Sequence, residues 1–268
     1  MKLGIFDSGL GGVLMARAIR RHLPRYDLVY LGDTLHMPYG GRSADALYHY
    51  TERAMDFLLG TQDCKLVIVA CNSASAAALR RLQRDYLPAR YPDRRILGVI
   101  VPTLEEALDR RHRRIGLLAT QRIAACGIYA EELTKLDPAI ALFAQAAPLL
   151  VPLIEHGGGR WIAEPLESYL APLMAQRIDS LILGCTHYPY LKPQIAAIVG
   201  PEVDILSQDE IVPGKLADYL HRHPEIETAL SCNGALRFFA TDVTEHYTAH
   251  AGALFGDPAL SMEQAVAA

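Results

Sequence analysis

Short apolar runs rich in β-branched side chains alternate with amphipathic, helix-forming segments along almost the whole chain. The predicted strands are residues 3–6, 27–32, 65–70, 95–101, 114–119, 144–150, 178–184, 203–207 and 236–241. Strands that alternate with helices usually form parallel sheets with helices on both faces. The pattern therefore predicts an α/β fold.

Two of these strands end in a similar way, which indicates two related halves. Cys71 follows the strand at 65–70, and Cys185 follows the strand at 178–184. We therefore expect two pseudosymmetric lobes, each a mainly parallel sheet flanked by helices, with the active site in the cleft between them. The expected first lobe, which holds Cys71, comprises residues 1–94 and 206–268. The expected second lobe, which holds Cys185, comprises residues 95–205.

Composition narrows the class of protein. The chain has 268 residues, of which 51% are hydrophobic, and a formal net charge of −4. Its one dense basic run, residues 110–114, precedes a predicted strand and is interpreted as a solvated helix end. No signal peptide is evident, and no apolar run approaches the roughly 20 residues of a membrane span. Five cysteines at irregular spacing favour reduced thiols, so we expect a cytoplasmic protein without nucleic-acid or membrane partners.

Both cysteines stand where a strand gives way to a helix, which is where open α/β sheets bind ligands. Asn72 and Ser73 follow the first cysteine, and Thr186 and His187 follow the second. Amide N–H groups at a helix start suit a carboxylate or phosphate. Two strand ends that each deliver a thiol beside polar donors are the main functional signal in the sequence.

Several chemistries compete for this pair of cysteines. A zinc site would have three ligands at best, Cys71, Cys185 and His187, and no C-x-x-C pair occurs. An inert, buried thiol remains an alternative for either cysteine. Catalysis is the third option, because the pKa of a thiol, ~8.5, falls at a helix start or beside a cation. Two thiols on opposite faces of one carbon could racemise it with neither a cofactor nor a metal.

Other polar residues at predicted strand ends are weaker signals. Asp7 and Ser8 begin a glycine-rich turn that does not have dinucleotide-binding spacing, and Asp7 is equally well explained as a helix cap. Tyr39 and Gly40 belong to a loop that could be a plain turn. Glu155 precedes a glycine run and is equally well explained as a surface helix end.

The chain resembles the glutamate racemases of the aspartate/glutamate racemase family. The motifs that carry the resemblance are Asp7-Ser8-Gly-Leu-Gly-Gly12, Gly32-Asp33-Thr34, Pro38-Tyr39-Gly40, Cys71-Asn72-Ser73-Ala-Ser75, Pro148 to Glu155, Gly184-Cys185-Thr186-His187-Tyr188-Pro189 and Arg237 to Thr241. The resemblance implies interconversion of L- and D-glutamate without a cofactor, for peptidoglycan synthesis. It leaves a homodimer open.

The same resemblance implies roles for individual residues. Cys71 is the base for D-glutamate, assisted by Asp7, and Cys185 is the base for L-glutamate, assisted by His187 and Glu155. The residues implied in substrate binding are Asp7, Ser8, Tyr39, Gly40, Asn72, Ser73, Thr186 and His187.

The sequence departs from the family pattern at three places. Ser73 replaces the more usual Thr, Ile123 replaces a second Thr, and Val101-Pro102-Thr103 stands where Glu-Pro-Gly is common. These changes leave both cysteines in place but bear on which substrate side chain the protein accepts. A racemase of aspartate or another amino acid, and a non-catalytic binding or inhibitor protein on the same scaffold, remain alternatives.

Overall fold

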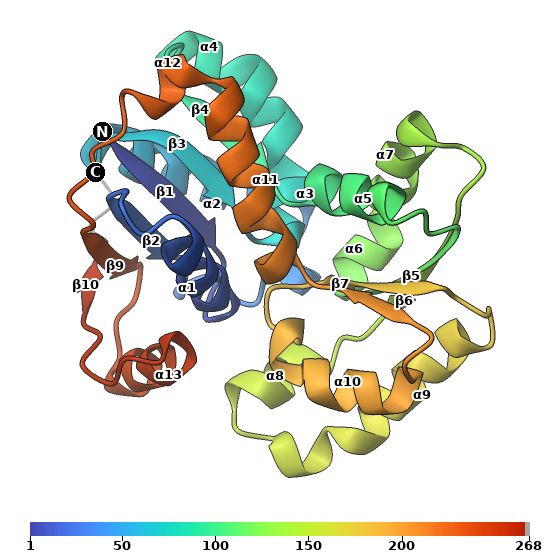
Figure 1. Ribbon diagram of the computed structural model, residues 1–268. Helices are drawn as coiled ribbons and strands as arrows, with labels where there is room; N and C mark the ends of the chain where they lie inside the picture. Colours follow the sequence, from blue (N-terminus) through green and yellow to red (C-terminus); the bar gives the residue numbers. More distant parts are fainter. Residues whose placement is uncertain (266–268) are drawn as a thin grey trace. The chain divides into compact units, whose positions relative to one another are not determined.

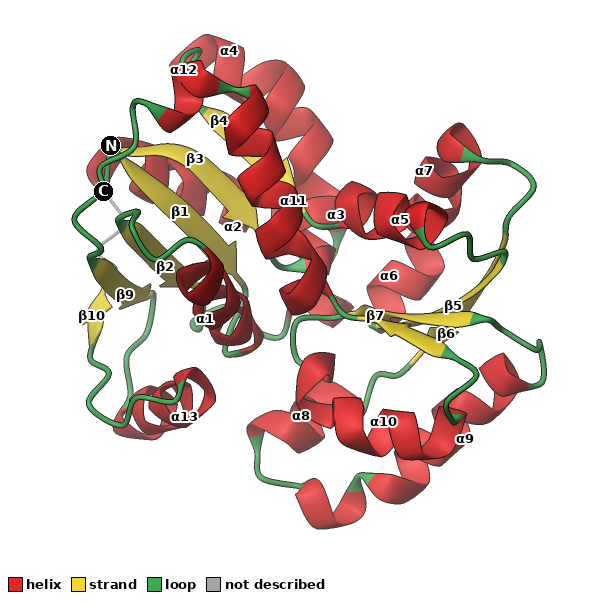
Figure 2. Ribbon diagram, viewed as in Figure 1, coloured by secondary structure: helices red, strands yellow, loops and turns green. Residues whose placement is uncertain are grey.

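The strands form two separate parallel sheets, as the apolar pattern predicts (Figures 1 and 2). The computed structural model describes residues 1–265. It divides the chain into two units: one combines Met1–Val99 with the stretch from Val212 onward, and the other is Ile100–Ile211. Each unit holds one sheet, so the prediction of an α/β protein with two sheets is confirmed.

The first sheet is built around the apolar strand β1. Its strands are β1 (Lys2–Asp7), β2 (Leu28–Gly32), β3 (Cys64–Val69), β4 (Arg95–Gly98), β9 (Leu236–Ala240) and β10 (Met262–Gln264). Their order is β10-β9-β2-β1-β3-β4, and every neighbouring pair is parallel. Asp7 pairs with Gly32 and Phe6 with Val69, so the central strands end at nearly the same level. The short edge strand β10 was not predicted.

The second sheet repeats part of this topology. Its strands are β5 (Arg114–Ala119), β6 (Ala141–Ala146), β7 (Ser180–Gly184) and β8 (Asp204–Leu206). Their order, β6-β5-β7-β8, is the order of β2-β1-β3-β4 in the first sheet. The first four strands of each unit thus lie in the order second, first, third, fourth, and the first sheet adds β9 and β10 beyond β2. Each of the two cysteines follows the third strand of its sheet, which is the pseudosymmetry that the sequence predicts.

Helices connect the strands and cover both faces of the first sheet (Figure 1). They are α1 (Gly11–His22), α2 (Ala44–Met55), α3 (Asn72–Arg81), α4 (Leu87–Arg90), α5 (Ile100–Asp109), α6 (Gln121–Cys126), α7 (Ile128–Leu136), α8 (Leu150–Glu155), α9 (Ala163–Met174), α10 (Lys192–Val199), α11 (Gln208–Arg222), α12 (Pro224–Glu227) and α13 (Glu245–Phe255). Within residues 1–265, none is long and apolar enough to cross a lipid bilayer.

Alternate side chains of each strand enter different cores. Ile5 packs into a core with the apolar sides of α1, α11 and α13, whereas Phe6 packs into another with α2 and α3. This division follows from the two-residue period of a strand. Because both faces are covered, the strands are apolar throughout, which explains the continuous apolar runs in the sequence.

The unit boundaries lie later in the chain than residues 94 and 205, where they were expected. Residues 95–98 form β4, which pairs with β3 from Leu66 to Val69 and so belongs to the first sheet. Leu206, expected in the first lobe, pairs with Ile182 in the second sheet. Strand pairing, which the local pattern does not record, determines both assignments. The helix α11 then passes the second boundary without interruption.

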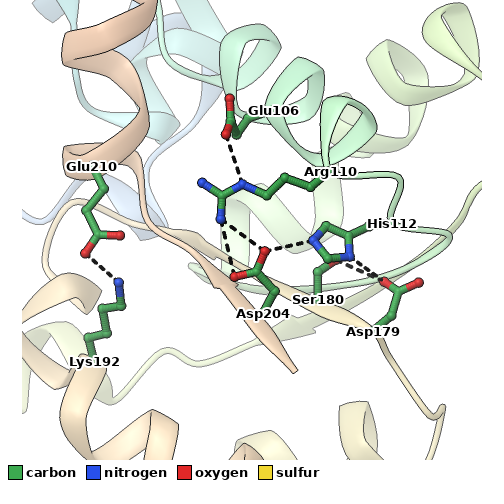
Figure 3. A network of polar contacts seen from close by, with 8 residues as sticks. All are labelled: Glu106, Arg110, His112, Asp179, Ser180, Lys192, Asp204 and Glu210. Atoms are coloured by element: carbon green, nitrogen blue, oxygen red, sulfur yellow. Dashed lines mark hydrogen bonds and ion pairs between the residues drawn. The ribbon is translucent and has the colours of Figure 1, made fainter. Parts of the chain in front are cut away.

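Polar contacts join the amino-terminal ends of the strands in the second sheet (Figure 3). His112 Nε2 lies 2.9 Å from Asp204 Oδ2, and His112 Nδ1 lies 3.6 Å from Asp179 Oδ1. Arg110 donates to Asp204 and to Glu106. These contacts connect the segments that precede β5 and β7 with the first residue of β8.

Candidate active site

Cys71 is the N-cap residue of α3 and stands two residues beyond the end of β3, directly after Ala70. Its side chain is largely buried, with 6% of the residue exposed. The Cys71 Sγ donates to Ser8 Oγ over 3.4 Å, so the turns after β1 and β3 meet at this thiol. The N–H groups of the first helical turn favour a negative charge at such a position.

Asp7 caps the helix that follows β1. Its Oδ2 accepts the N–H of Gly9 at 3.1 Å and the N–H of Gly12 at 3.0 Å, and the residue is fully buried. A Cβ at Gly12 would lie 2.2 Å from the Cβ of Asp7, so only glycine permits this approach. The capping role that the sequence left open is confirmed, and a catalytic role for Asp7 stays a prediction.

Asn72 and Ser73 are the first two residues of α3 and are almost fully buried. Both lie beside Cys71 in the chain, at the helix start that was expected to bind a carboxylate. Thr186 holds the corresponding position after Cys185 and is 6% exposed. Their placement agrees with the predicted binding roles, which stay predictions.

Tyr39 is held by a buried carboxylate, Asp33, which belongs to one of the family motifs but was not among the predicted site residues. Its hydroxyl donates to Asp33, which also accepts from Thr241 Oγ1 at 2.8 Å and lies 2.8 Å from His36 Nδ1. Burial raises the pKa of Tyr39 far above its ordinary value, and the charge of Asp33 adds to the effect. The phenolic proton is therefore held in the hydrogen bond to Asp33, so the Tyr39 oxygen can act only as an acceptor toward other groups. Gly40, the next residue in the chain, is partly exposed.

A sequence signal for this cluster was available. Asp33 directly follows β2, and Thr241 directly follows the neighbouring strand β9. The carboxyl ends of adjacent parallel strands meet at one edge of a sheet, so two polar residues at such ends are expected to be neighbours.

In the second unit, Cys185, His187 and Glu155 form a chain of contacts. His187 Nδ1 lies 3.7 Å from Cys185 Sγ, and His187 Nε2 lies 2.7 Å from Glu155 Oε1. All three residues are less than 8% exposed. Glu155 ends α8, and its side chain is buried against His187. The alternative that Glu155 is an exposed helix end is therefore wrong.

The surroundings of His187 favour its protonated form. Burial by itself lowers the pKa of an imidazole, but the hydrogen bonds and charges of Cys185 and Glu155 outweigh it and raise the pKa of His187 well above its usual value. Nε2–H then donates to the carboxylate, and Nδ1–H donates to the sulfur.

The other cysteines lack these surroundings. Burial raises the pKa of the Cys64 thiol to about 12, which makes it unreactive. Cys126 and Cys232 each donate to a nearby backbone carbonyl. Among residues 1–265, no group of three or more His, Cys, Asp or Glu side chains is arranged to hold a metal ion.

Ile123, which replaces a hydroxyl residue of the family pattern, is buried in α6 and is 1% exposed. Its N–H donates to Thr120 Oγ1, the cap of that helix. Thr103 belongs to the third departure from the family pattern and is fully buried in α5, the helix that begins directly after the unit boundary.

Comparison of the chain with known proteins identifies its family. The family model of the Asp/Glu/Hydantoin racemases matches residues 14–207. This chain belongs to that family. A glutamate racemase of Cereibacter sphaeroides is 39% identical over 239 residues, which cover 84% of this chain and 87% of that protein.

Solved structures of the family share the whole fold. A glutamate racemase of Bacillus anthracis, the isoform RacE1, has a TM-score of 0.88 at 29% identity, covering 98% of this chain and 96% of that one. A glutamate racemase of Francisella tularensis, solved with D-glutamate, has a TM-score of 0.85 at 28% identity, covering 98% and 95%. The predicted family, fold class and enzyme class, an isomerase, are confirmed.

Proposed function

We propose that this protein is a cofactor-independent glutamate racemase that supplies D-glutamate for peptidoglycan synthesis in the cytoplasm. The observation that carries the proposal is the repeated placement of Cys71 and Cys185. Each follows the third strand of a sheet with the same strand order, and each has its own polar partners. Relatives named glutamate racemase, one of them solved with D-glutamate, support glutamate as the substrate.

In the direction from D- to L-glutamate, the thiolate of Cys71 removes the proton from the α-carbon. The electron pair of the broken C–H bond moves onto the α-carbon and its carboxylate. The thiol of Cys185 then delivers its proton to the opposite face, which leaves Cys71 as the thiol and Cys185 as the thiolate. This product state is the starting state for L-glutamate, so the reverse reaction uses the same two groups.

The contacts of the second unit suit the exchange at Cys185. When Cys185 gives up its proton, the protonated His187 offsets the new negative charge 3.7 Å away, and Glu155 keeps His187 oriented. When Cys185 instead gains a proton, the pair of charges on His187 and Glu155 remains balanced. His187 therefore assists one thiol in both directions.

The first unit supplies most of the groups proposed to hold the substrate. The helix-start N–H groups of α3, with the side chains of Asn72 and Ser73, suit a carboxylate. Tyr39 offers an oxygen lone pair because its proton is on the bond to Asp33, so it suits the substrate ammonium better than a carboxylate.

Racemisation can be followed directly by circular dichroism of L-glutamate mixed with the pure protein. We expect the signal to decay to zero, and we expect aspartate and other amino acids in a panel to react much more slowly. If aspartate is turned over as fast as glutamate or faster, the proposal that glutamate is the substrate is wrong. A constant signal for every amino acid would instead favour the non-catalytic binding protein.

The two-thiol mechanism is tested in heavy water. L-Glutamate should give D-glutamate that carries solvent deuterium at the α-carbon, while recovered L-glutamate carries much less early in the reaction. Cys71→Ala and Cys185→Ala should each abolish racemisation, because each removes the group on one face. Cys64→Ala is the matched control and should retain turnover. Deuterium in substrate and product alike would indicate a single base, and activity in either site variant would exclude the mechanism.

A further inference from the structure

The first unit contains a cavity of about 110 Å³ that the proposed reaction does not use. Its apolar walls come from Leu31 of β2 and from Tyr50, Ala54 and Phe57 of the helical stretch that begins with α2. An engineered apolar cavity of about 150 Å³ binds benzene. This cavity is smaller, so a single ring or a branched aliphatic group is the largest body that it accepts.

Two hydrogen-bond donors on α2 line the same cavity. Tyr50 and Arg53 are three residues apart, so they share one face of the helix. Among the residues that the structure describes, neither the Tyr50 hydroxyl nor the Arg53 guanidinium has a hydrogen bond or ion pair. A phenol and a guanidinium at an apolar cavity are chemically complementary to a carboxylate.

The buried wall of the cavity is the carboxylate cluster that holds Tyr39. Asp33 lines the cavity, is 3% exposed, and accepts the Tyr39 hydroxyl. The ring of His36, which contacts Asp33, stacks on the Tyr50 ring at 4.1 Å between centroids. Because Asp33 would repel a second carboxylate, the carboxylate of a ligand should lie at the exposed Arg53. The apolar body of the ligand should then lie inside the cavity.

We propose that this cavity binds a small carboxylate with an aromatic or branched aliphatic body, and that its occupancy acts on Tyr39 through Asp33. The second half of this statement rests on the proposed function, because it concerns a residue proposed to hold the substrate. The binding itself is independent of any reaction and can be measured alone.

Benzoate is the probe, titrated into the full chain by calorimetry or ligand-observed NMR. We expect saturable binding, weakened about tenfold or more by Arg53→Gln because a charge-assisted hydrogen bond is lost. Ala54→Leu fills the cavity and should abolish binding. Arg21→Gln, on an exposed arginine of α1, is the matched control and should leave binding unchanged. Benzyl alcohol, which has the ring without the charge, should bind much more weakly.

Equal benzoate affinity in wild type and in Arg53→Gln would overturn the proposal, as would equal affinity for benzyl alcohol. Benzoate should also change the KM or kcat for glutamate in wild type but not in Arg53→Gln, whose basal turnover should match wild type. A protein that binds benzoate as described but never racemises glutamate would refute the proposed function and leave the cavity site standing. A racemase whose rate ignores bound benzoate would refute the coupling through Asp33.

Discussion

His187 shows how three buried side chains set one another's charge. An isolated buried imidazole would be neutral, yet contacts with Cys185 and Glu155 keep this one protonated. The carboxylate of Glu155 lies 2.7 Å from Nε2, on the side of the ring away from the thiol. We therefore propose that Glu155 is a positioning residue, which would act on Cys185 through His187.

Replacing Glu155 by Gln tests this dependence. The folded-state pKa of His187 is raised, so its proton is present at neutral pH and is lost as pH rises through that pKa. Glu155→Gln removes the negative charge that helps to raise the pKa of His187. His187 should therefore lose its proton at a lower pH in this variant. We expect the alkaline decline of kcat to shift downward, in parallel with the NMR titration of His187. An unchanged pH profile, as expected for the exposed control Glu167→Gln, would contradict the role.

In the proposed mechanism, Asp7 and His187 assist different cysteines, so their variants should affect the two directions differently. In Asp7→Asn, the amide oxygen can still accept the N–H groups that Asp7 caps, while the charge is lost. Because the two enantiomers have equal free energies, kcat/KM must fall equally in both directions. Asp7→Asn and His187→Asn should therefore differ from each other in how kcat and KM change separately. Identical kcat changes for both enantiomers in both variants would argue against separate roles.

At the level of elements, carboxylates also tie the ends of strands. Asp27 precedes β2 and accepts from the Asn233 amide side chain at 2.8 Å and from the Ala235 N–H at 2.8 Å, just before β9. Burial alone would raise its pKa, but these and further hydrogen bonds, including one from Ser231, lower it to about 2. The side chain thereby holds the paired strands β2 and β9 in register at their starts.

This depressed pKa predicts acid sensitivity of the first unit. The stabilisation is present above the ordinary pKa of an Asp and is lost as pH falls from about 4 to about 2. Asp27→Asn should lower the free energy of unfolding at pH 7 by roughly 1–2 kcal/mol and should flatten its dependence on pH in that window. Urea unfolding at several pH values provides the measurement. Asp218→Asn on α11 is the control, and matching profiles for both variants would disprove the assignment.

At the level of the whole molecule, two units that share the order of four strands are joined by one chain that crosses between them twice. Each unit has its own apolar core and its own polar ties. In the second unit, burial opposes ionisation of Asp204, but hydrogen bonds from His112 and Arg110 outweigh it and lower the pKa of Asp204 (Figure 3). A mutation that removes one of these polar contacts should therefore destabilise only the unit that contains it.

Asp204→Asn tests that independence. Because the Asp204 side chain is more than a third exposed, we expect a loss of less than about 1 kcal/mol, confined to the second unit. Amide hydrogen exchange should speed up in β7 and β8 and stay unchanged in β1 to β3. The control variant Glu202→Gln, at an exposed residue, should change the exchange rates of neither group of strands. Equal acceleration in both sheets would mean that the units unfold together.

The sequence by itself determined the alternation of strands and helices and the two cysteines at strand ends. These features are local, because a two-residue or 3.6-residue period and a polar residue after an apolar run are visible in a short window. The resemblance to a family added the roles of residues far apart in the chain.

Tertiary structure alone decided which strands pair and which polar groups meet. Residues 95–98 joined the first sheet because their backbone groups hydrogen-bond to β3, a choice that no local pattern expresses. Glu155 became buried because α8 brings it to His187, and Tyr39 lost its donor because Asp33 accepts it. Pairing and burial depend on neighbours distant in sequence, so the charges and free donors of the site emerge only when the chain is folded.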